Sequence, residues 1–549
     1  MRVNTLIAGV VCASGLLAQD AALFPRLAYF RDHFTSPKTR VELQPPVRFQ
    51  DFIVDGKLEL SLRSYLELVL ANNTDIAIQR LSLETPRNAI LRAFGTFDPV
   101  FTSSFNASRQ KSASTSVLQG ATLLSSLSQR LNTGYQQTLD SGTQFNVNLN
   151  GTKDSSNDAF RTFNPALNAT MQFGFTQPLL RNRGTYVTRL PIMVARSQLR
   201  RSEYDLRDQL MRLITTAETA YWDVVDAREN LKVQQDYLKL SDVALKRAQR
   251  ELELGAISPL EIYRPQQQYA NAEIAVSRYQ YQLAQREDAL RRQVGADLSP
   301  EIRKLPIVLT ETVSPFLDSR PYDQEALVEK ALATRPDLRS QLQTLDIDQL
   351  QIKQATNNLR PDLSLTANYS AQGRGGTFYE RANVFGQSQL VRVVPGGLGD
   401  AMDQLFGFTL PTYSFGLTLR LPLRDRARHA DLADALVRKK IDSLRARNLE
   451  QQIRLDVLNA INQVEAAKAG VQLARVALDF AQKQVEAEQK RYDLGVTIMY
   501  FVLQAQTELA QAQSELVRNS ISYRRNLLTL LRVTGELLDE RGVIVNGGR

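Results

Sequence analysis

The chain is poor in the residues that usually carry enzyme chemistry: its 549 residues include one cysteine, one tryptophan and two histidines. The cysteine, Cys12, lies in an apolar stretch near the N-terminus, so the rest of the chain has no thiol for a disulfide, a metal or a nucleophile. His33 and His429 are far apart in the sequence, and neither lies near a second ligand or a nucleophile. No glycine-rich phosphate loop or paired carboxylates stand out. We therefore expect no catalytic residues, no metal and no cofactor.

Long hydrophobic runs are also lacking. No window after the N-terminal stretch approaches the roughly 20 apolar residues that a membrane-spanning helix requires. If the mature protein crosses a membrane, it must therefore do so as a β-barrel. The formal charge is +9, but the 67 basic and 58 acidic residues are interspersed along the helical segments. We expect a solvated charged surface and no nucleic-acid partner.

The N-terminus has the pattern of an export signal. Met1 and Arg2 form a short basic region, and Leu6 to Leu17 form an apolar stretch too short to span a bilayer. The small residue Ala18 follows, so we expect residues 1–18 to be removed. Lipidation of Cys12 is an open alternative, which the bulky Val11 before it disfavours.

The chain contains an internal duplication. Leu254-Gly255 recurs as Leu494-Gly495, 240 residues later, and the flanking residues match at the same offset. Upstream, Asp98-Pro99 recurs as Arg360-Pro361 at an offset of 262, so the segments that follow the two prolines differ in length. This pattern predicts one structural unit used twice, with insertions of different size.

Long helical hairpins are predicted in both copies. Apolar or small residues step by four and three from Leu206 to Leu252, and again from Val464 to Tyr492, which is typical of coiled-coil packing. At about 1.5 Å per residue, a helix of about 60 to 70 residues is on the order of 100 Å long. The glycines should end these helices in the left-handed conformation. We expect Ser258 and Thr497 to cap the return helices.

The insertions after the two prolines alternate between apolar and small polar residues. The apolar positions include Phe101, Phe105, Phe145, Val147, Leu149, Met171, Phe173, Phe175, Leu363, Leu365, Tyr369, Tyr413, Phe415, Leu417 and Leu419. This alternation is typical of outer-membrane strands, with a lipid-facing and a water-facing side. A half-buried strand of a soluble sandwich has the same pattern and is the alternative.

Residues 109–142, 151–166 and 373–409 are rich in Ser, Asn and Gly, and we expect loops there. The first insertion has about four strand-like segments and the second about two. The extra strands would either enlarge the barrel or form a surface hairpin. One chain has too few strands to close a barrel, so closure requires other copies.

This order of features, from about Leu58 to Gly535, resembles the outer membrane efflux protein family whose namesake is TolC. The resemblance implies a mainly α fold with β: a homotrimer with an α-helical coiled-coil tunnel, built from two long helical hairpins per chain. A twelve-stranded transmembrane β-barrel would lie in the outer membrane of a Gram-negative bacterium, in contact with its lipid, with the tunnel in the periplasm. The implied partners are a periplasmic adaptor (membrane fusion) protein and an inner-membrane RND pump or ABC exporter.

The resemblance also assigns residues. The adaptor-contacting tip turns map onto Leu254, Gly255, Ser258, Leu494, Gly495 and Thr497. A periplasmic gate maps onto Glu261 after the first turn and Tyr492 before the second, unless these are only a first-turn acid and a seam residue. Where some members carry two pore-lining aspartates, this chain has Phe501 and Gln504, so we do not expect a cation-binding constriction there.

The expected organisation follows the duplication. It comprises a signal peptide (1–18), an N-terminal arm (19–57), helices of the first repeat (58–97), the first β-barrel insertion (98–178), the first long hairpin (179–295), a linker (296–322), helices of the second repeat (323–360), the second insertion (361–423), the second long hairpin (424–535) and a C-terminal tail (536–549). The expected function is the exit duct of a tripartite efflux or type I secretion system. The alternative is an exported coiled-coil scaffold or adhesin without a pore. The exported substrate stays open, since the inner-membrane partner selects it.

Overall fold

The computed structural model describes residues 52–114, 119–295, 305–313, 322–382 and 389–543. The chain divides into two compact units, Met1–Pro46 and Val47–Arg549, and all described residues belong to the second. The expected signal peptide, Cys12, His33 and most of the N-terminal arm lie outside the described residues, as do parts of the linker and the C-terminal tail.

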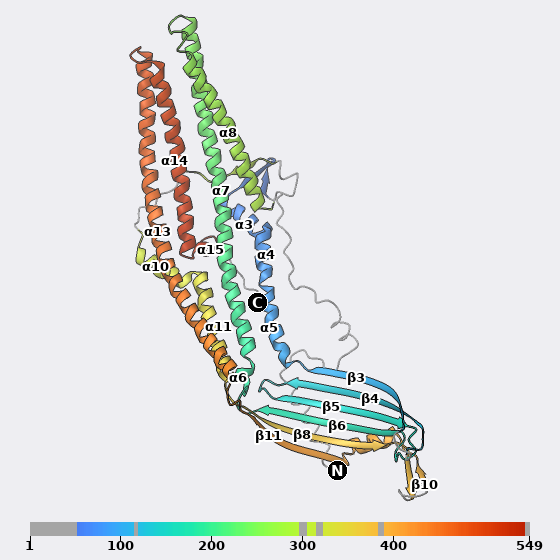
Figure 1. Cartoon of the computed structure of the whole chain (residues 1–549). Coiled ribbons are helices and arrows are strands. Elements are labelled where there is room, and N and C mark those ends of the chain that lie inside the picture. Colours follow the sequence, from blue (N-terminus) through green and yellow to red (C-terminus); the bar gives the residue numbers. More distant parts are fainter. Residues whose placement is uncertain (1–51, 115–118, 296–304, 314–321, 383–388, 544–549) are drawn as a thin grey trace. The chain divides into compact units, whose positions relative to one another are not determined.

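Two long helical hairpins are the largest elements of the second unit (Figure 1). The first comprises α7 (Leu190–Glu253, 64 residues) and α8 (Tyr263–Gln293), and the second comprises α13 (Arg426–Asp493, 68 residues) and α14 (Met499–Val533). At about 1.5 Å per residue, α7 and α13 are each on the order of 100 Å long. The predicted long helices are therefore confirmed.

Shorter helices precede each hairpin. The first repeat has α3 (Leu62–Asn72), α4 (Thr74–Ser82), α5 (Glu84–Phe94) and the 3-10 turn η2 (Gly95–Phe97), and the second has α10 (Gln324–Thr334) and α11 (Pro336–Asn358). The short helices α6 (Thr185–Thr188) and α15 (Leu537–Glu540) adjoin the long ones. Helix α7 contacts α8, α11 and α14, and α13 contacts α10, α11 and α14, so the two hairpins pack side by side.

The largest apolar core lies midway along α7. It surrounds a small sheet of β1 (Ile53–Val54), β2 (Lys57–Leu60) and β7 (Ile307–Leu309), in which β2 and β7 are parallel. The rings of Tyr65 and Tyr221 lie 5.5 Å apart in this core. The Tyr65 hydroxyl donates to the Ala217 carbonyl at 3.1 Å, and the Tyr221 hydroxyl donates to the Leu60 carbonyl at 3.2 Å. Both buried phenols are thus satisfied.

The insertions form a six-stranded antiparallel sheet in the order β11-β8-β6-β5-β4-β3. Its strands are β3 (Val100–Ala113), β4 (Leu123–Thr138), β5 (Gln144–Ser156), β6 (Ala166–Pro178), β8 (Asp362–Gly375) and β11 (Leu410–Arg420). The first insertion therefore supplies four strands and the second supplies two, as the alternation predicted.

The expected loops are wrong in part. Strand β4 occupies much of 109–142, and the end of β5 lies within 151–166. The segment 373–409 contains the hairpin of β9 (Phe378–Ala382) and β10 (Gln389–Val394), and also α12 (Leu398–Phe406). Serine and asparagine favour turns in isolation, but pairing with neighbouring strands overrides that local preference.

Helix α12 packs on the apolar face of the sheet near the ends of β6 and β8. Its Ala401 and Leu405 are buried against Ala169 and Ala371. A Cβ atom at Gly373 would lie 1.9 Å from the Ala401 carbonyl oxygen, so this close approach requires glycine.

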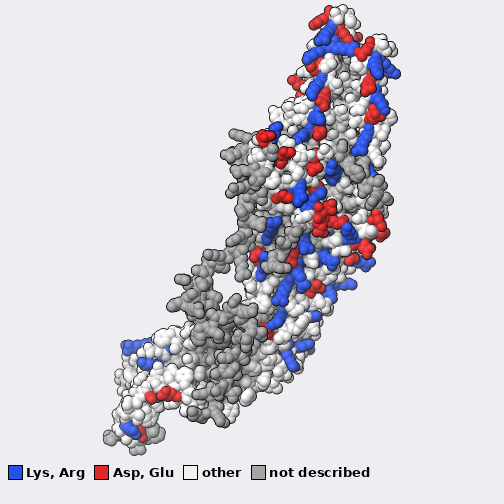
Figure 2. Space-filling view, turned by 180° about the vertical axis from the view of Figure 1, so that it is seen from behind, with Lys and Arg blue, Asp and Glu red and all other residues white. Residues whose placement is uncertain are grey.

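Charge is distributed as the sequence predicted. Lys, Arg, Asp and Glu are interspersed along the helices in the face shown in Figure 2. Within the part of the chain that the structure describes, no helix has the length and apolar character needed to cross a membrane.

Candidate functional site: the hairpin tips and the contacts behind them

Each long hairpin turns at a glycine in the left-handed conformation. The φ angles are +72° at Gly255 and +69° at Gly495. The Gly255 amide donates to the Leu252 carbonyl at 3.0 Å, and the next amide donates to the Glu251 carbonyl at 2.8 Å. The equivalent bonds in the second turn are both 2.9 Å. This is the Schellman arrangement, so the predicted left-handed glycine caps are confirmed.

Apolar side chains project from the turns. Leu254 is 82% exposed and Leu494 is 79% exposed, and Leu260 and Val496 are exposed nearby. Two equivalent turns thus present leucines to solvent at the same position in the repeat.

The predicted capping roles of Ser258 and Thr497 are wrong. Helix α8 begins at Tyr263, and the Ser258 hydroxyl accepts a hydrogen bond from the Leu260 amide at 3.3 Å within a separate turn. The Glu261 amide donates to the Ser258 carbonyl at 2.9 Å, which closes that turn before the helix starts. Helix α14 begins after Ile498, and no side chain caps it.

Within about two turns of the glycines, four side chains join α7 to α13. We call Arg247, Glu251, Tyr492 and Asp493 the tip latch. The Tyr492 hydroxyl donates to Glu251 Oε2 at 2.5 Å. Arg247 donates through Nη1 to Asp493 Oδ1 at 2.7 Å and through Nε to Glu251 Oε1 at 2.9 Å. The Arg247 guanidinium also lies 4.6 Å from the centre of the Tyr492 ring. The two hairpins are therefore tied together near their tips within one chain.

The acid that binds Tyr492 is Glu251 and not Glu261. Among the described residues, no hydrogen bond joins Glu261 to Tyr492; the Glu261 charge acts on the phenol only as a minor electrostatic influence. Burial, followed by the hydrogen bond to Glu251, raises the pKa of Tyr492 to about 12, so the phenol is a proton donor at neutral pH. Arg247 and Glu251 lie four residues apart, which is the spacing of an ion pair on one helix. This spacing is the sequence feature from which their ion pair could be predicted.

A second set of contacts lies farther from the tips. Gln268 on α8 donates to the Tyr237 hydroxyl on α7 at 2.8 Å and to the Leu503 carbonyl on α14 at 3.2 Å. The Tyr237 and Thr507 hydroxyls lie 3.0 Å apart in a hydrogen bond. These contacts border a hollow of about 620 Å³. They add a second bridge between the hairpins behind the tip latch.

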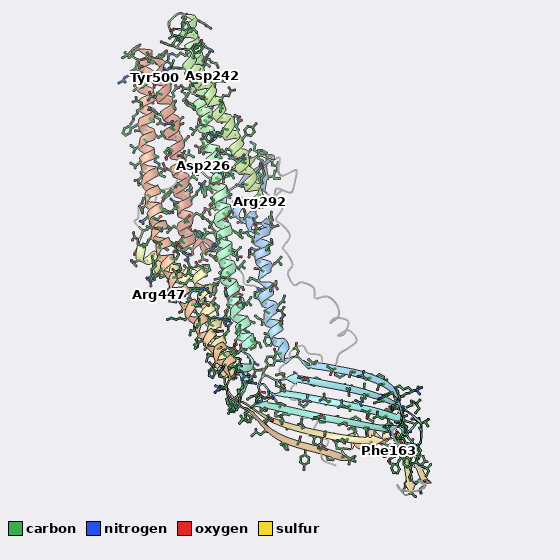
Figure 3. All side chains as sticks on the ribbon, viewed as in Figure 1. Phe163, Asp226, Asp242, Arg292, Arg447 and Tyr500 are labelled. Atoms are coloured by element: carbon green, nitrogen blue, oxygen red, sulfur yellow. The ribbon has the colours of Figure 1, made fainter. Side chains whose placement is uncertain are left out.

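The two positions expected to replace pore aspartates lie near this hollow. Gln504 lines it and donates to Glu508 on the same helix at 3.0 Å. The Phe501 ring is half exposed and contacts the ring of Tyr500 at 5.3 Å between centres. In Figure 3, Tyr500 on α14 and Asp242 on α7 are both labelled toward the tip ends of their helices.

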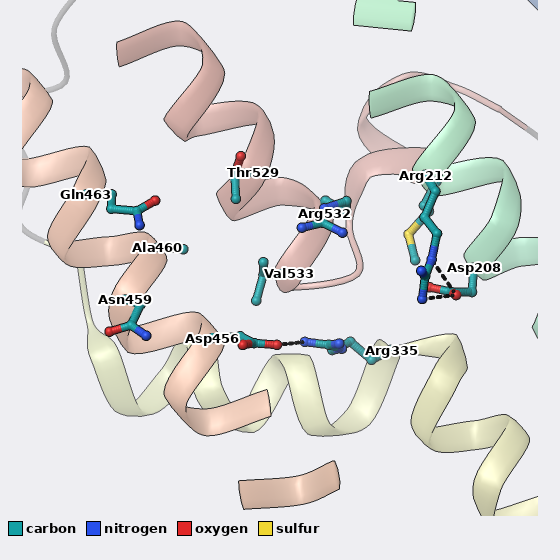
Figure 4. A pocket seen from close by; sticks show the side chains of 11 residues that line it. Asp208, Arg212, Arg335, Asp456, Asn459, Ala460, Gln463, Thr529, Arg532 and Val533 are labelled. Carbon is teal, nitrogen blue, oxygen red and sulfur yellow. Dashed lines mark hydrogen bonds and ion pairs between the residues drawn. The ribbon is translucent and has the colours of Figure 1, made fainter. Parts of the chain in front are cut away.

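A smaller polar cavity of about 280 Å³ lies between α7, α13, α14 and the junction of α10 with α11 (Figure 4). Arg335 at this junction pairs with Asp337 at 2.6 Å and with Asp456 on α13 at 3.3 Å. Arg212 and Asp208 pair across one turn of α7 at 2.9 Å. Of these ion pairs, Arg335–Asp456 ties the α10–α11 junction to α13. In the described part of the chain, no group of three or more His, Cys, Asp and Glu side chains is placed to hold a metal.

Comparisons with known proteins agree with this architecture. Residues 327–536 match the family model described as outer membrane efflux protein. Outer membrane protein TolC of Escherichia coli strain K12 is 24% identical over 353 residues, which cover 62% of this chain and 64% of TolC.

Two solved structures show the same fold. Crystal structures of CusC match with a TM-score of 0.61 at 15% identity, covering 91% of this chain and 99% of CusC. The Campylobacter jejuni CmeC outer membrane channel matches with a TM-score of 0.60 at 15% identity, covering 92% of this chain and 90% of CmeC. The duplicated hairpins, the two-faced sheet and these matches lead to one conclusion: residues 327–536 resemble the outer membrane efflux protein family, and the chain has the fold of outer-membrane channels of the TolC type.

Proposed function

We propose that this protein is the exit duct of a tripartite efflux system, which carries small molecules from the periplasmic side across the outer membrane. One observation carries the proposal. A sheet with one apolar and one polar face is connected along the same chain to two helical hairpins of matching length. Strand β6 leads through the short helix α6 into α7, β11 leads into α13, and both long helices end at equivalent exposed turns.

The sheet has the dimensions that a membrane wall needs. On β8 and β11, apolar residues face one side from the Leu363–Leu419 pair to the Ala371–Pro411 pair. Eight steps of about 3.3 Å correspond to about 26 Å along the strand, and a tilt of about 40° leaves about 20 Å across the membrane, most of the roughly 25 Å apolar band of outer-membrane barrels. Phe415 is 77% exposed in a single copy, so the apolar face is uncovered there in the described chain, away from the end of the sheet on which α12 packs.

The hairpins supply the periplasmic tunnel in this proposal. A homotrimer would place six such hairpins in a ring, and the apolar tip turns at Leu254, Gly255, Leu494 and Gly495 would receive a periplasmic adaptor protein. Ser258 and Thr497 flank those contacts. The inner-membrane partner would be an RND pump or an ABC exporter, and export of proteins by a type I secretion system is the second candidate.

The gate belongs to the same proposal. Tyr492, bound to Glu251, would hold the hairpins of each copy together until the adaptor engages the tips. Glu261, Phe501 and Gln504 would lie along the opening without forming the tie. No catalytic step is assigned to any residue.

Deletion of the gene in its own bacterium tests this function. We expect the deletion strain to accumulate a fluorescent efflux substrate, and a plasmid copy of the gene to reverse the accumulation. Fractionation of the same cells distinguishes the scaffold alternative, since a duct requires detergent for extraction. A detergent-free soluble protein whose loss leaves dye accumulation unchanged would contradict the proposal.

A further inference from the structure

We propose that all six strands, including the inserted hairpin β4–β5, form the wall of the channel, so that each copy supplies six strands and not four. This inference rests on the proposed function, because it takes the sheet to stand in the outer membrane. Its subject is the hairpin of residues 123–156, which separates β3 from β6 in the sheet.

The inserted hairpin shares the apolar face of the other strands, with Leu131 and Tyr135 of β4 and Phe145, Val147 and Leu149 of β5 on that side, although Thr133 and Gln137 also lie there. One row of directly paired residues crosses the whole sheet: Phe101, Tyr135, Val147, Phe173, Tyr369 and Tyr413. Directly paired residues of antiparallel strands point to the same face. Five of the six are aromatic, and aromatic side chains are common on the lipid-facing side of outer-membrane strands. Tyr135 and Val147 place the hairpin in the same row and on the same face as the other strands.

The polar face is equally continuous. The adjacent row is Thr102, Gly134, Asn148, Gln172, Ser370 and Thr412, all uncharged. Apolar residues on one side and uncharged polar residues on the other are what a wall between lipid and water requires. A hairpin standing in water above the membrane would have no need of an apolar face in register with its neighbours.

The two edges of the sheet can close on a second copy of this chain. β3 and β11 are the edge strands. β3 leads away from the helices that precede it, and β11 leads back into α13, so β3 of one copy lies antiparallel to β11 of the next. Because each copy supplies an even number of strands, neighbouring strands stay antiparallel all the way around a closed ring of copies. With three copies the wall would contain eighteen strands and would be about 1.5 times as wide as one of twelve, since barrel diameter grows about linearly with strand number.

Cysteine accessibility at neighbouring positions tests the proposal. Cys12 is the one cysteine of the sequence, so a Cys12→Ser background carries single substitutions without interference. Asn148→Cys and Val147→Cys probe the two faces of β5, and Asn368→Cys and Ala367→Cys are the matched pair on β8. Detergent-free outer membranes are treated with a water-soluble maleimide, and labelling is quantified for each variant.

We expect Asn148→Cys to be labelled at least tenfold faster than Val147→Cys. We expect the same difference between Asn368→Cys and Ala367→Cys. Equal, fast labelling at 147 and 148 with a retained difference at 367 and 368 would place the hairpin in water and overturn the six-strand wall, while leaving the duct intact. Fast labelling of both members of both pairs would remove the sheet from the membrane and overturn the proposed function. A single-particle reconstruction would count the strands directly, with six per copy expected and four contradicting the proposal.

Discussion

Replacing Tyr492 by phenylalanine should loosen the tie between the two hairpins without disturbing their packing. The substitution removes the hydroxyl that donates to Glu251 at 2.5 Å and keeps the ring that lies 4.6 Å from the Arg247 guanidinium. A hydrogen bond to a charged group contributes about 1.5 to 3 kcal/mol, and we take the lower end because the Glu251 side chain is 22% exposed. At about 1.4 kcal/mol per factor of ten, the balance between closed and open tips should shift about tenfold in each copy.

The assay is the open probability of single channels in planar bilayers. A double-mutant cycle of Tyr492→Phe and Glu251→Ala measures the interaction between these two side chains. Tyr492→Phe should have little further effect on open probability once the Glu251 acceptor is absent. Glu261→Ala is the matched control: it removes an acid close to the tips that forms no hydrogen bond with Tyr492 in the described structure. Unchanged gating in Tyr492→Phe, or an equally large effect of Glu261→Ala, would refute the assignment of the latch to Glu251.

Three further predictions concern acid, the turn and the C-terminus. The Arg247 hydrogen bond, followed by that of Gln489, holds the pKa of Asp493 below its usual 3.8, so this tie is present at neutral pH and is lost as pH falls through that lowered value. Open probability should therefore stay level from about pH 8 to about pH 5 and rise only in stronger acid, and a rise near pH 6 would contradict this. Gly495→Ala, at φ +69°, should strain the turn by about 1 to 2 kcal/mol and speed amide hydrogen exchange at the tip while exchange in the core stays the same. Arg541 donates to both oxygens of the buried Glu218 at 3.0 and 2.7 Å, so Arg541→Ala should lower the free energy of unfolding by about 3 kcal/mol in urea, with partial recovery on adding Glu218→Gln.

The sequence predicted the parts of this fold that depend on regular periodicity. The 3.5-residue spacing of Leu206 to Leu252 and the glycine at each turn specify α7 and its end, because packing seams and left-handed caps leave a local signal. The alternation around Phe145 and Tyr413 likewise specified β5 and β11.

Features decided by pairing between distant segments were not predictable in the same way. Strand β4 is rich in Ser, Gln and Asn and was expected as a loop, yet its backbone pairs with β3 and β5 on both sides. The helix starts after Ser258 and Thr497 were also missed, because a turn at Ser258-Pro259 delays α8.

The tip latch shows the same limit. Arg247 and Glu251 are ordinary charged residues on a helix surface, and only the packing of α7 beside α13 brings them to Tyr492 and Asp493. The resemblance placed the tyrosine at the tie, but it placed the acid after the turn instead of before it. Which of two acids near a turn faces a neighbouring helix depends on helix phase and packing, and the spacing alone does not fix it.

The most direct test of the duct is planar-bilayer conductance of the detergent-extracted protein, with the oligomer mass determined on the same sample. The proposed function predicts discrete conductance steps from a particle of three chains, and Tyr492→Phe should raise their open probability. A protein that is soluble without detergent and gives no conductance would contradict the duct and favour the coiled-coil scaffold.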